Sequence, residues 1–379
     1  MNKKNNLVQT ASSFDWVLLA VTLITSVFGI ISIYSATRSM ETMSNVYVQT
    51  ASLAIGIILL TAVSLFDYEQ FSVLVPYIYG VCIIFLILVL IPGIGFSDNW
   101  GARSWIRFNS VIGFQPAEIA KIGFVLTFSY HLQRVEENVN KPLTLLLLIA
   151  HLGVIILLIM FQPDAGSAMV FTFMFICMIF VAKISYKYII PTFCVGIASL
   201  PIIYFFLLEP HQKTRIKVFL NPESEPLVGG YNVIQSKIAV GSGQLTGKGF
   251  LQGTQNQMKL LPTKHTDFIY SVISEEWGFV GSVFVTLLLF FIIYRCFRTA
   301  QDADTPMGKY ICTGIGAMLF FHTFENIGMC IGLTPVTGIP LPFVSYGGTS
   351  LITNFIAIGL VLSVYLHSNN SMFKNKEVN

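Results

Sequence analysis

The sequence predicts an all-α polytopic integral membrane protein with about ten transmembrane helices. Hydrophobic residues make up 54% of the 379 residues and charged residues 11%, and the mean hydropathy is +0.71. Soluble domains carry about 25% charged residues, so this composition is typical of a membrane protein. A bilayer core of about 30 Å needs about 20 apolar residues per helix, and ten stretches qualify, some marginally: residues 16–34, 46–66, 73–91, 115–132, 143–161, 165–182, 188–208, 278–294, 310–331 and 349–366.

The basic residues predict the orientation of these spans. With both termini in the cytoplasm, the short outside loops carry only Arg38, Arg103 and Arg107. The inside segments then carry eleven basic residues, namely Lys3, Lys4, Arg134, Lys141, Lys183, Lys187, Arg295, Arg298, Lys309, Lys374 and Lys376. This bias follows the positive-inside rule. It predicts cytoplasmic termini and one long extracytoplasmic loop, residues 209–277, between spans seven and eight.

Composition also limits the classes of function. The net charge of +3 is too small to indicate a nucleic-acid partner. The six cysteines all lie in apolar stretches, so they predict neither a disulfide framework nor a metal site; they are Cys82, Cys177, Cys194, Cys296, Cys312 and Cys330. Without a tandem repeat or a separate soluble region, we expect one membrane domain over residues 1–379.

The loop 209–277 is expected to be organised. Apolar residues recur at helical spacing from Tyr231 to Ala239, as in an amphipathic helix on a membrane surface. A glycine-rich stretch follows, but it lacks the spacing of a Rossmann or P-loop nucleotide site, because Thr246 and Ser242 stand where glycine is needed. These glycines are expected to provide tight turns and close backbone approaches.

Polar residues inside spans are costly and therefore informative. Gln115, Glu118 and Lys121 share one helix face, and they predict either an internal ion pair or the charged wall of a substrate cavity. Asp164 precedes span six, where it can cap the helix and also form a salt bridge to Lys121. Glu325 is expected in an interhelical hydrogen-bond cluster with His322 and Asn326.

Two outside loops concentrate polar side chains. Trp105 can anchor the chain at the membrane interface, and Arg103 beside it can bind a pyrophosphate. The densest cluster precedes span eight, where it is either a solvated loop or a reactive site; it contains Lys264, His265, Asp267, Glu275 and Glu276. Lys264 and His265 can neutralise phosphate there, and Asp267 can accept a proton.

These motifs, in this order, resemble the SEDS family (shape, elongation, division and sporulation) over nearly the whole chain. The resemblance is carried by GARSWI (101–106), QPAEIAKI (115–122), QPDAGSA (162–168), GYNVIQSKIAVGSGQLTGKGFLQGTQ (230–255), LPTKHTDFIYSVISEEWGFVG (261–281) and NIGMCIGLTPVTGIPLPFVSYGGTS (326–350). The segment 335–348 is similar to the rod-shape, elongation branch. Ser104, Ala117, Thr263 and Cys330 depart from the residues common in the family, and Ser104 puts part of the anion-binding role of GARSWI in doubt.

The resemblance implies a ten-helix enzyme of the bacterial cytoplasmic (inner) membrane whose active site faces the periplasm or exterior. It implies a peptidoglycan glycosyltransferase that polymerises lipid II into β-1,4 glycan strands with inversion, and Asp267 matches the essential aspartate of the family. Substrate-binding residues are expected at Arg103, Trp105, Gln115, Glu118, Lys121, Asp164, Lys264, His265, Glu275, Glu276 and Ser345. A groove lined by spans four to seven would admit the lipid.

The resemblance further implies partners. We expect a class B penicillin-binding protein, which is a transpeptidase, and other membrane proteins of the rod complex. The sequence requires no cofactor and no bound metal, although a divalent cation (Mg²⁺ or Mn²⁺) could assist the departure of pyrophosphate.

Two alternatives remain at this stage. A lipid II flippase would concentrate polar groups near the bilayer midplane, whereas here the richest cluster lies in an outside loop. A non-catalytic scaffold for wall synthesis would tolerate loss of the Asp267 carboxylate. Polymer formation in detergent distinguishes the three hypotheses.

Overall fold

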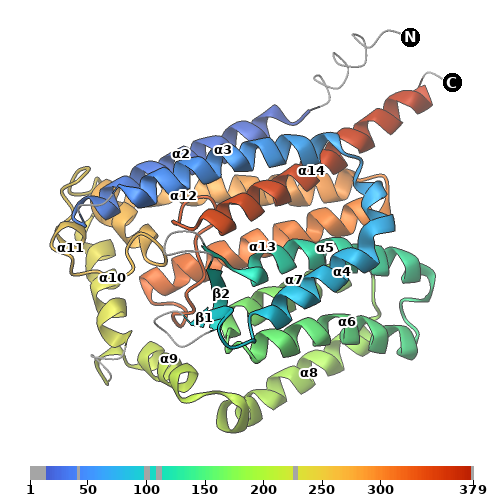
Figure 1. Ribbon diagram of the computed structural model, residues 1–379, viewed down its shortest axis with the longest axis horizontal. Coiled ribbons are helices and arrows are strands. Elements are labelled where there is room, and N and C mark those ends of the chain that lie inside the picture. Colours follow the sequence, from blue (N-terminus) through green and yellow to red (C-terminus); the bar gives the residue numbers. More distant parts are fainter. Residues whose placement is uncertain (1–13, 41–42, 98–102, 108–112, 225–228, 377–379) are drawn as a thin grey trace.

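A computed structural model describes residues 14–40, 43–97, 103–107, 113–224 and 229–376, and it consists mainly of long helices (Figure 1). Ten of them coincide with the ten predicted stretches: α2 (Trp16–Arg38), α3 (Ser44–Leu65), α4 (Phe71–Leu88), α5 (Pro116–Val135), α6 (Pro142–Met160), α7 (Ala165–Val181), α8 (Tyr186–Ile202), α12 (Ile269–Asp302), α13 (Pro306–Ile331) and α14 (Gly348–Lys376). The predicted basic residues Lys3 and Lys4, and Gly101 and Ala102 of the GARSWI motif, lie outside the described ranges.

Seven helices of the described chain are long and apolar enough to cross a membrane, and α7 is a shorter apolar helix. The chain is therefore a polytopic membrane protein. The other two predicted spans are less regular for identifiable reasons. α5 contains the charged pair Glu118 and Lys121. α8 contains Pro191 and Pro201 and continues as the π-helix η3 (Ile203–Leu207), because each proline removes a backbone donor.

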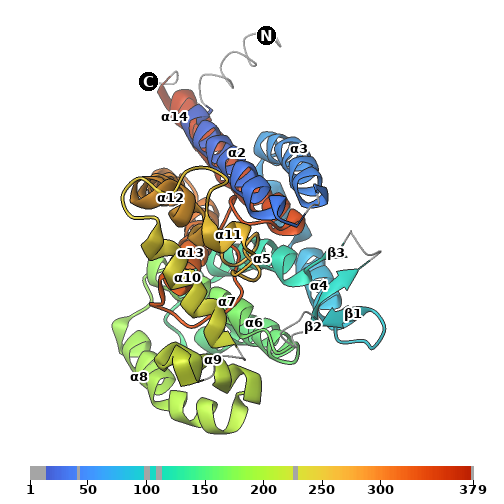
Figure 2. The ribbon, with the colours of Figure 1, turned by 90° about the vertical axis from the view of Figure 1, so that its left-hand side faces the viewer.

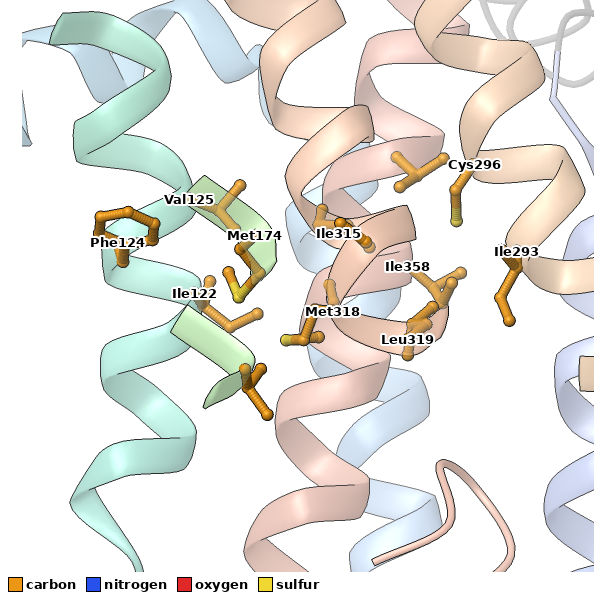
Figure 3. Close-up of a cluster of buried hydrophobic side chains, with 14 of the residues drawn as sticks. Ile122, Phe124, Val125, Met174, Ile293, Cys296, Ile315, Met318, Leu319 and Ile358 are labelled. Carbon is orange, nitrogen blue, oxygen red and sulfur yellow. The ribbon is translucent and has the colours of Figure 1, made fainter. Parts of the chain in front are cut away.

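The start of α2 and the end of α14 lie at one end of the bundle, opposite the short helices α10 (Tyr231–Ser242) and α11 (Thr254–Gln257) (Figure 1). We call the end that carries α10 and α11 the loop end. α13 and α14 are the most enclosed of the seven apolar helices. Figure 3 shows side chains of α5, α7, α12 and α14 meeting around α13, with Ile122, Met174, Ile315, Met318 and Ile358 among them.

One small sheet corrects the prediction that the fold is wholly α-helical. Strands β1 (Gly95–Ser97), β2 (Arg103–Arg107) and β3 (Gly113–Phe114) pair antiparallel in the order β1-β2-β3. Figure 2 shows this sheet beside α4 and α5, at the loop end. The residues of β2 alternate in exposure, with Ser104 and Ile106 buried and Arg103 exposed, as expected for a strand that covers other structure with one face.

The eighth predicted span, 278–294, lies within α12, which begins earlier, at Ile269. Gly278 interrupts this helix with φ 66° and ψ −160°, a conformation that strongly favours glycine. At this kink the N–H groups of Phe279 and Val280 bond to the carbonyls of Gln244 and Leu245. The glycine-rich stretch therefore docks against α12.

The predicted amphipathic helix is confirmed as α10, and the predicted close backbone approaches are confirmed as well. A Cβ on Gly247 would lie 2.2 Å from the carbonyl oxygen of Glu276, and φ there is +81°. The remainder of the loop forms α9 (Pro210–Leu220) and η4 (Pro222–Ser224). The loop 209–277 thus consists largely of helices and turns packed at the loop end.

Candidate active site

Asp267 lies in a tight turn, residues 263–268, immediately before α12. Asp267 as a whole is half-buried. Thr263 begins the turn with φ 45°, and its carbonyl accepts from the N–H groups of Thr266 and Phe268. A carboxylate at the N-terminus of a helix is stabilised in its ionised form by the aligned backbone dipoles. The turn therefore places the Asp267 side chain just before the N-terminus of α12, at the loop end of the bundle.

Three successive backbone carbonyls of this turn are held, two by the segment that runs from α13 to α14 and one by α13 itself. The N–H of Tyr346 donates to His265, and the hydroxyl of Ser345 donates to Thr266 at 2.7 Å. The amide of Asn326, in α13, donates to the carbonyl of Asp267 at 2.9 Å. The same amide also donates to the carbonyl of Ile339 at 2.8 Å. These bonds fix the backbone of the turn without using the carboxylate.

The loop between α13 and α14 also lies close to the Asp267 carboxylate itself. A Cβ on Gly338, whose φ is +80°, would lie 3.9 Å from Oδ2 of Asp267. A Cβ on Gly166, in the first turn of α7, would lie 3.3 Å from the Thr337 carbonyl. Residues 337–339 therefore bring the start of α7 close to Asp267.

At the start of α7, Asp164 caps the helix, as predicted. Its Oδ1 accepts from the N–H of Ser167 at 2.9 Å, and its Oδ2 accepts from the Ser167 hydroxyl and from the side-chain amide of Gln115 at 2.8 and 3.2 Å. The predicted additional salt bridge to Lys121 is wrong in this conformation. Lys121 instead pairs with Glu118 at 2.7 Å and contacts Nε2 of His322 at 3.0 Å.

The Glu118–Lys121 pair confirms the predicted internal ion pair, with side-chain exposures of 6% and 2%. Because two charges at membrane depth are costly unless they are paired, each side chain stabilises the other there. Glu325 is likewise buried, and its Oε1 accepts from the Thr337 hydroxyl at 3.1 Å. His322 and Asn326 point to other partners, so the expected cluster of Glu325 with these two residues is not formed.

Lys264 and His265 lie next to Asp267 in sequence but occupy different surroundings. Lys264 is fully buried, and its ammonium donates to the hydroxyl of Ser39 at 2.6 Å and to the carbonyl of Asn256. Burial lowers the pKa of Lys264 to about 8, and it also lowers the pKa of His265, with Lys264 as the second cause. Lys264 therefore connects the end of α2 to the backbone at Asn256. The lowered pKa of His265 favours its neutral form.

Glu275 and Glu276 are also buried. Glu275 accepts from Lys248 at 2.8 Å and from the N–H groups of Gln255 and Asn256 at 2.9 and 3.1 Å. Glu276 accepts from the Ser35 hydroxyl at 2.6 Å and from the amide of Asn256 at 2.9 Å. Both carboxylates hold the glycine-rich segment against α12 and α2, and neither is directed at open space.

Arg103 and Trp105 lie on the same face of β2, since side chains alternate along a strand. Arg103 is exposed, and Trp105 is half-buried. β3 continues this sheet toward α14, where the Thr349 hydroxyl donates to the carbonyl of Gly113 at 3.3 Å. Among the predicted site residues, Arg103 is thus a cation available at the surface of the loop end.

Two asparagines shape this region and were not predicted as site residues. Asn326 fixes the Asp267 turn, and Asn256 joins Ser35, Glu276 and Lys264. Both are fully buried. Asn326 could have been singled out by its amide at membrane depth, where an unpartnered polar group is costly. Asn256 gives no such signal, because it lies in a polar loop.

Among the described residues, no group of three His, Cys, Asp or Glu side chains is arranged to hold a metal ion. The Asp267 turn offers one carboxylate with fixed backbone geometry. A carboxylate at such a position can accept a hydrogen bond or a proton.

The chain is similar to known proteins over most of its length. The family described as cell cycle proteins and named for FtsW, RodA and SpoVE matches residues 15–370. The peptidoglycan glycosyltransferase MrdB of Escherichia coli (strain K12) is 35% identical over 356 residues, which cover 93% of this chain and 94% of MrdB. The peptidoglycan glycosyltransferase RodA of Treponema pallidum (strain Nichols) is 32% identical over 435 residues, with coverages of 94% and 98%.

Solved structures share the fold as well. A chain from a structure described as "Structural coordination of polymerization and crosslinking by a peptidoglycan synthase complex" matches with a TM-score of 0.80 at 28% identity, covering 94% of this chain and 98% of that one. The crystal structure of the rod shape determining protein RodA of Thermus thermophilus matches with a TM-score of 0.70 at 27% identity, with coverages of 93% and 96%.

Proposed function

The chain belongs to the family of cell cycle proteins named for FtsW, RodA and SpoVE, and we propose that it is a peptidoglycan glycosyltransferase that polymerises lipid II. The names of its relatives MrdB and RodA support this activity. The observation that carries the proposal is the Asp267 turn, where three backbone carbonyls are fixed by Tyr346, Ser345 and Asn326 while the residue itself stays half-buried.

In the proposed reaction, Asp267 is the general base. Its carboxylate takes the proton of the C4 hydroxyl of an incoming lipid II. The oxygen then attacks C1 of the lipid-linked glycan, the C1–O bond to pyrophosphate breaks, and the pyrophosphate leaves with the electron pair. One direct displacement inverts the anomeric centre, so an α-linked donor gives a β-1,4 glycan.

The leaving pyrophosphate needs positive charge nearby. Arg103 is proposed for this role, because it is exposed on β2 at the loop end. Trp105 on the same strand face would lie against the substrate or the membrane interface. Lys121 would have to exchange Glu118 for the pyrophosphate, since the two are paired at 2.7 Å. Gln115 and Asp164 would border the substrate through the start of α7.

The remaining predicted substrate residues receive supporting roles in this proposal. Lys264, Glu275, Glu276 and Ser345 all use their polar atoms within the protein, so we assign them to holding the loop around the substrate. His265 is held neutral by its surroundings and would contribute hydrogen bonding rather than charge.

The proposed topology has ten spans in a single membrane domain, cytoplasmic termini and a loop end that faces the periplasm or exterior. The start of α2 and the end of α14 on one side of the bundle support it (Figure 1), as does the distribution of basic residues. Lipid II would then enter between spans four to seven, with its sugars at the outer surface and its tail in the bilayer. The enzyme would act in the bacterial inner membrane.

We further propose a class B penicillin-binding protein as partner, together with other membrane proteins of the rod complex. The related structure described as coordinating polymerization and crosslinking supports a transpeptidase partner. Relatives named FtsW and RodA are similarly close to this chain, at 34% and 32% identity, so overall identity does not separate division from elongation. The assignment to elongation therefore rests on the segment 335–348. A divalent cation would assist only by neutralising pyrophosphate.

The decisive experiment is polymerisation of lipid II by the purified protein in detergent, alone and with its transpeptidase, with and without Mg²⁺. Asp267→Asn is expected to keep the thermal unfolding temperature and to lower the rate by a factor of about 10²–10⁴, the usual contribution of a general base. Asp302→Asn is the matched control, because Asp302 is a half-exposed aspartate at the other end of the same helix.

Full activity of Asp267→Asn would refute the assignment of the base. Absence of polymer from the wild-type protein, together with movement of lipid II between leaflets of a vesicle, would establish the flippase alternative instead. Normal growth of cells that carry Asp267→Ala would indicate a scaffold.

A further inference from the structure

A pocket lies away from the Asp267 turn, between α4, α5 and α6. It is lined by Ser72, Val73, Val75, Pro76, Tyr79, Thr127, Tyr130, His131, Arg134 and His151. The three helices contact one another pairwise. Glu118 and Arg134 are both on α5, and sixteen residues of helix span about 24 Å. The pocket is therefore close to the end of the bundle opposite the loop end, and the proposed reaction does not use it.

The inner wall of this pocket is a hydrogen-bonded histidine pair. Nδ1 of His131 lies 3.2 Å from Nδ1 of His151, and Nε2 of His151 lies 3.1 Å from the Thr127 hydroxyl. Tyr79 donates its hydroxyl to the carbonyl of His151 at 2.9 Å. These contacts account for both ring nitrogens of His151 and for one of His131. Within the described residues, Nε2 of His131 has no hydrogen-bond partner.

The outer wall carries a positive charge. Arg134 is exposed in the last turn of α5, with its Nε 2.8 Å from the Tyr130 hydroxyl and its guanidinium over the Tyr130 ring. This bond uses one donor, and within the described residues the other guanidinium N–H groups have no acceptor. Arg134 lines the pocket. The acidic residues Glu136 and Glu137 follow in η2 (Glu136–Asn138) and do not line the pocket.

The surroundings of the pocket are apolar and face outward. Val73 and Tyr77 on α4 are 75% and 70% exposed, and Leu143 and Leu146 on α6 are 69% and 62% exposed. In a membrane protein such side chains contact lipid tails. The pocket thus places cationic and hydroxyl groups beside an apolar surface. Basic pockets between transmembrane helices near a membrane face bind anionic lipid head groups.

We propose that this pocket binds the phosphate head group of an anionic phospholipid. Arg134 would pair with the phosphate oxygens, and His131 would donate from Nε2 while its Nδ1 accepts from His151. The acyl chains would lie along the exposed faces of α4 and α6. The site is independent of the polymerisation chemistry proposed for Asp267.

The test uses delipidated full-length protein in detergent and phosphatidylglycerol as the probe, with binding counted by native mass spectrometry. Phosphatidylglycerol is expected to bind more tightly than phosphatidylcholine and to raise the unfolding temperature. Arg134→Gln is expected to weaken phosphatidylglycerol binding about fivefold, the usual contribution of one basic residue near anionic lipid. Arg298→Gln is the matched control, since Arg298 is a half-exposed arginine near the C-terminus of α12 and outside the pocket.

Several outcomes would overturn the proposal. They are equal affinity of the wild-type protein for the two lipids, unchanged binding in Arg134→Gln, and equal loss in Arg298→Gln. Stabilisation by inorganic phosphate as large as that by phosphatidylglycerol would also refute a lipid site. Arg134→Lys, which keeps the charge, is expected to keep the preference for phosphatidylglycerol even if Arg134→Gln does not fold.

Discussion

Two acidic regions lie within ten residues of each other in sequence, and the structure treats them in opposite ways. Glu275 and Glu276 have buried carboxylates that accept hydrogen bonds from backbone N–H groups, a lysine, a serine and an asparagine. Asp267 has its backbone carbonyl held by Asn326, while the residue is half-buried. Glu275 and Glu276 thus use their carboxylates to hold the fold together. At Asp267 the surrounding fold instead holds the backbone of the residue.

This contrast gives a physical criterion for separating structural from reactive carboxylates. A buried carboxylate is stable only when its oxygens are saturated with donors, and a saturated carboxylate is a poor proton acceptor. A general base needs the reverse, namely fixed geometry and an oxygen that a substrate can reach. Four predictions test the comparison, from the largest expected effect to the smallest.

Glu275→Ala should be the most damaging change to stability. It leaves Lys248 and the N–H groups of Gln255 and Asn256 without their acceptor, so the free energy of unfolding should fall by about 3–5 kcal/mol, the usual cost of breaking a buried pair. Denaturation in detergent micelles measures this. Glu223→Ala, at an exposed position of the same loop, should change stability little. A Glu275→Ala protein as stable as wild type would remove the distinction between the two regions.

Asn326→Leu should weaken the clamp on the Asp267 turn. The carbonyls of Asp267 and Ile339 lose the amide donor, at a cost of about 2–4 kcal/mol in total. Because the base is displaced, kcat should fall more than KM rises. Asn354→Leu is the control, because the Asn354 side chain is buried and makes no hydrogen bond. Equal effects of the two substitutions on kcat would argue against a positioning role for Asn326.

Lys264→Met should change how stability depends on pH. The pKa of Lys264 is lowered to about 8 from 10.5, so above pH 8 the unfolded chain holds a proton that the folded protein has released. Wild-type stability therefore rises between about pH 8 and 10.5 through this group, and the variant should lack that increment. Unfolding temperatures of both proteins across this range provide the measurement. Parallel curves would show that Lys264 titrates normally.

Arg103→Gln should have the smallest effect on the fold, since exposed substitutions usually change stability by less than about 0.5 kcal/mol. If Arg103 pairs with pyrophosphate, the KM for lipid II should rise about tenfold, as expected for one charged hydrogen bond of about 1.5 kcal/mol. Steady-state polymerisation measures it. Arg38→Gln, at an exposed arginine in the last turn of α2, should leave KM unchanged. Identical KM values for Arg103→Gln and wild type would remove Arg103 from the site.

Much of this protein was predictable from its sequence by local rules. Apolar length located all ten helices, although α12 begins nine residues earlier and α14 ends ten residues later than the predicted spans. Helical periodicity located α10, and Asp164 at a helix start predicted the cap that forms. The Glu118–Lys121 pair followed from their spacing of three residues. These features depend on the chain within one or two helical turns, so neighbouring residues are enough to define them.

Only the tertiary structure decided which polar groups face inward. Lys264, His265 and Asp267 lie within four residues, yet Lys264 is tied to Ser39 of the α2 end and Asp267 to Asn326 of α13. The glycine-rich stretch docks at the Gly278 kink of α12, and Lys121 meets His322 rather than Asp164. Each of these outcomes is set by partners far away in sequence, because a buried polar group takes whichever donor or acceptor the packed helices bring to it.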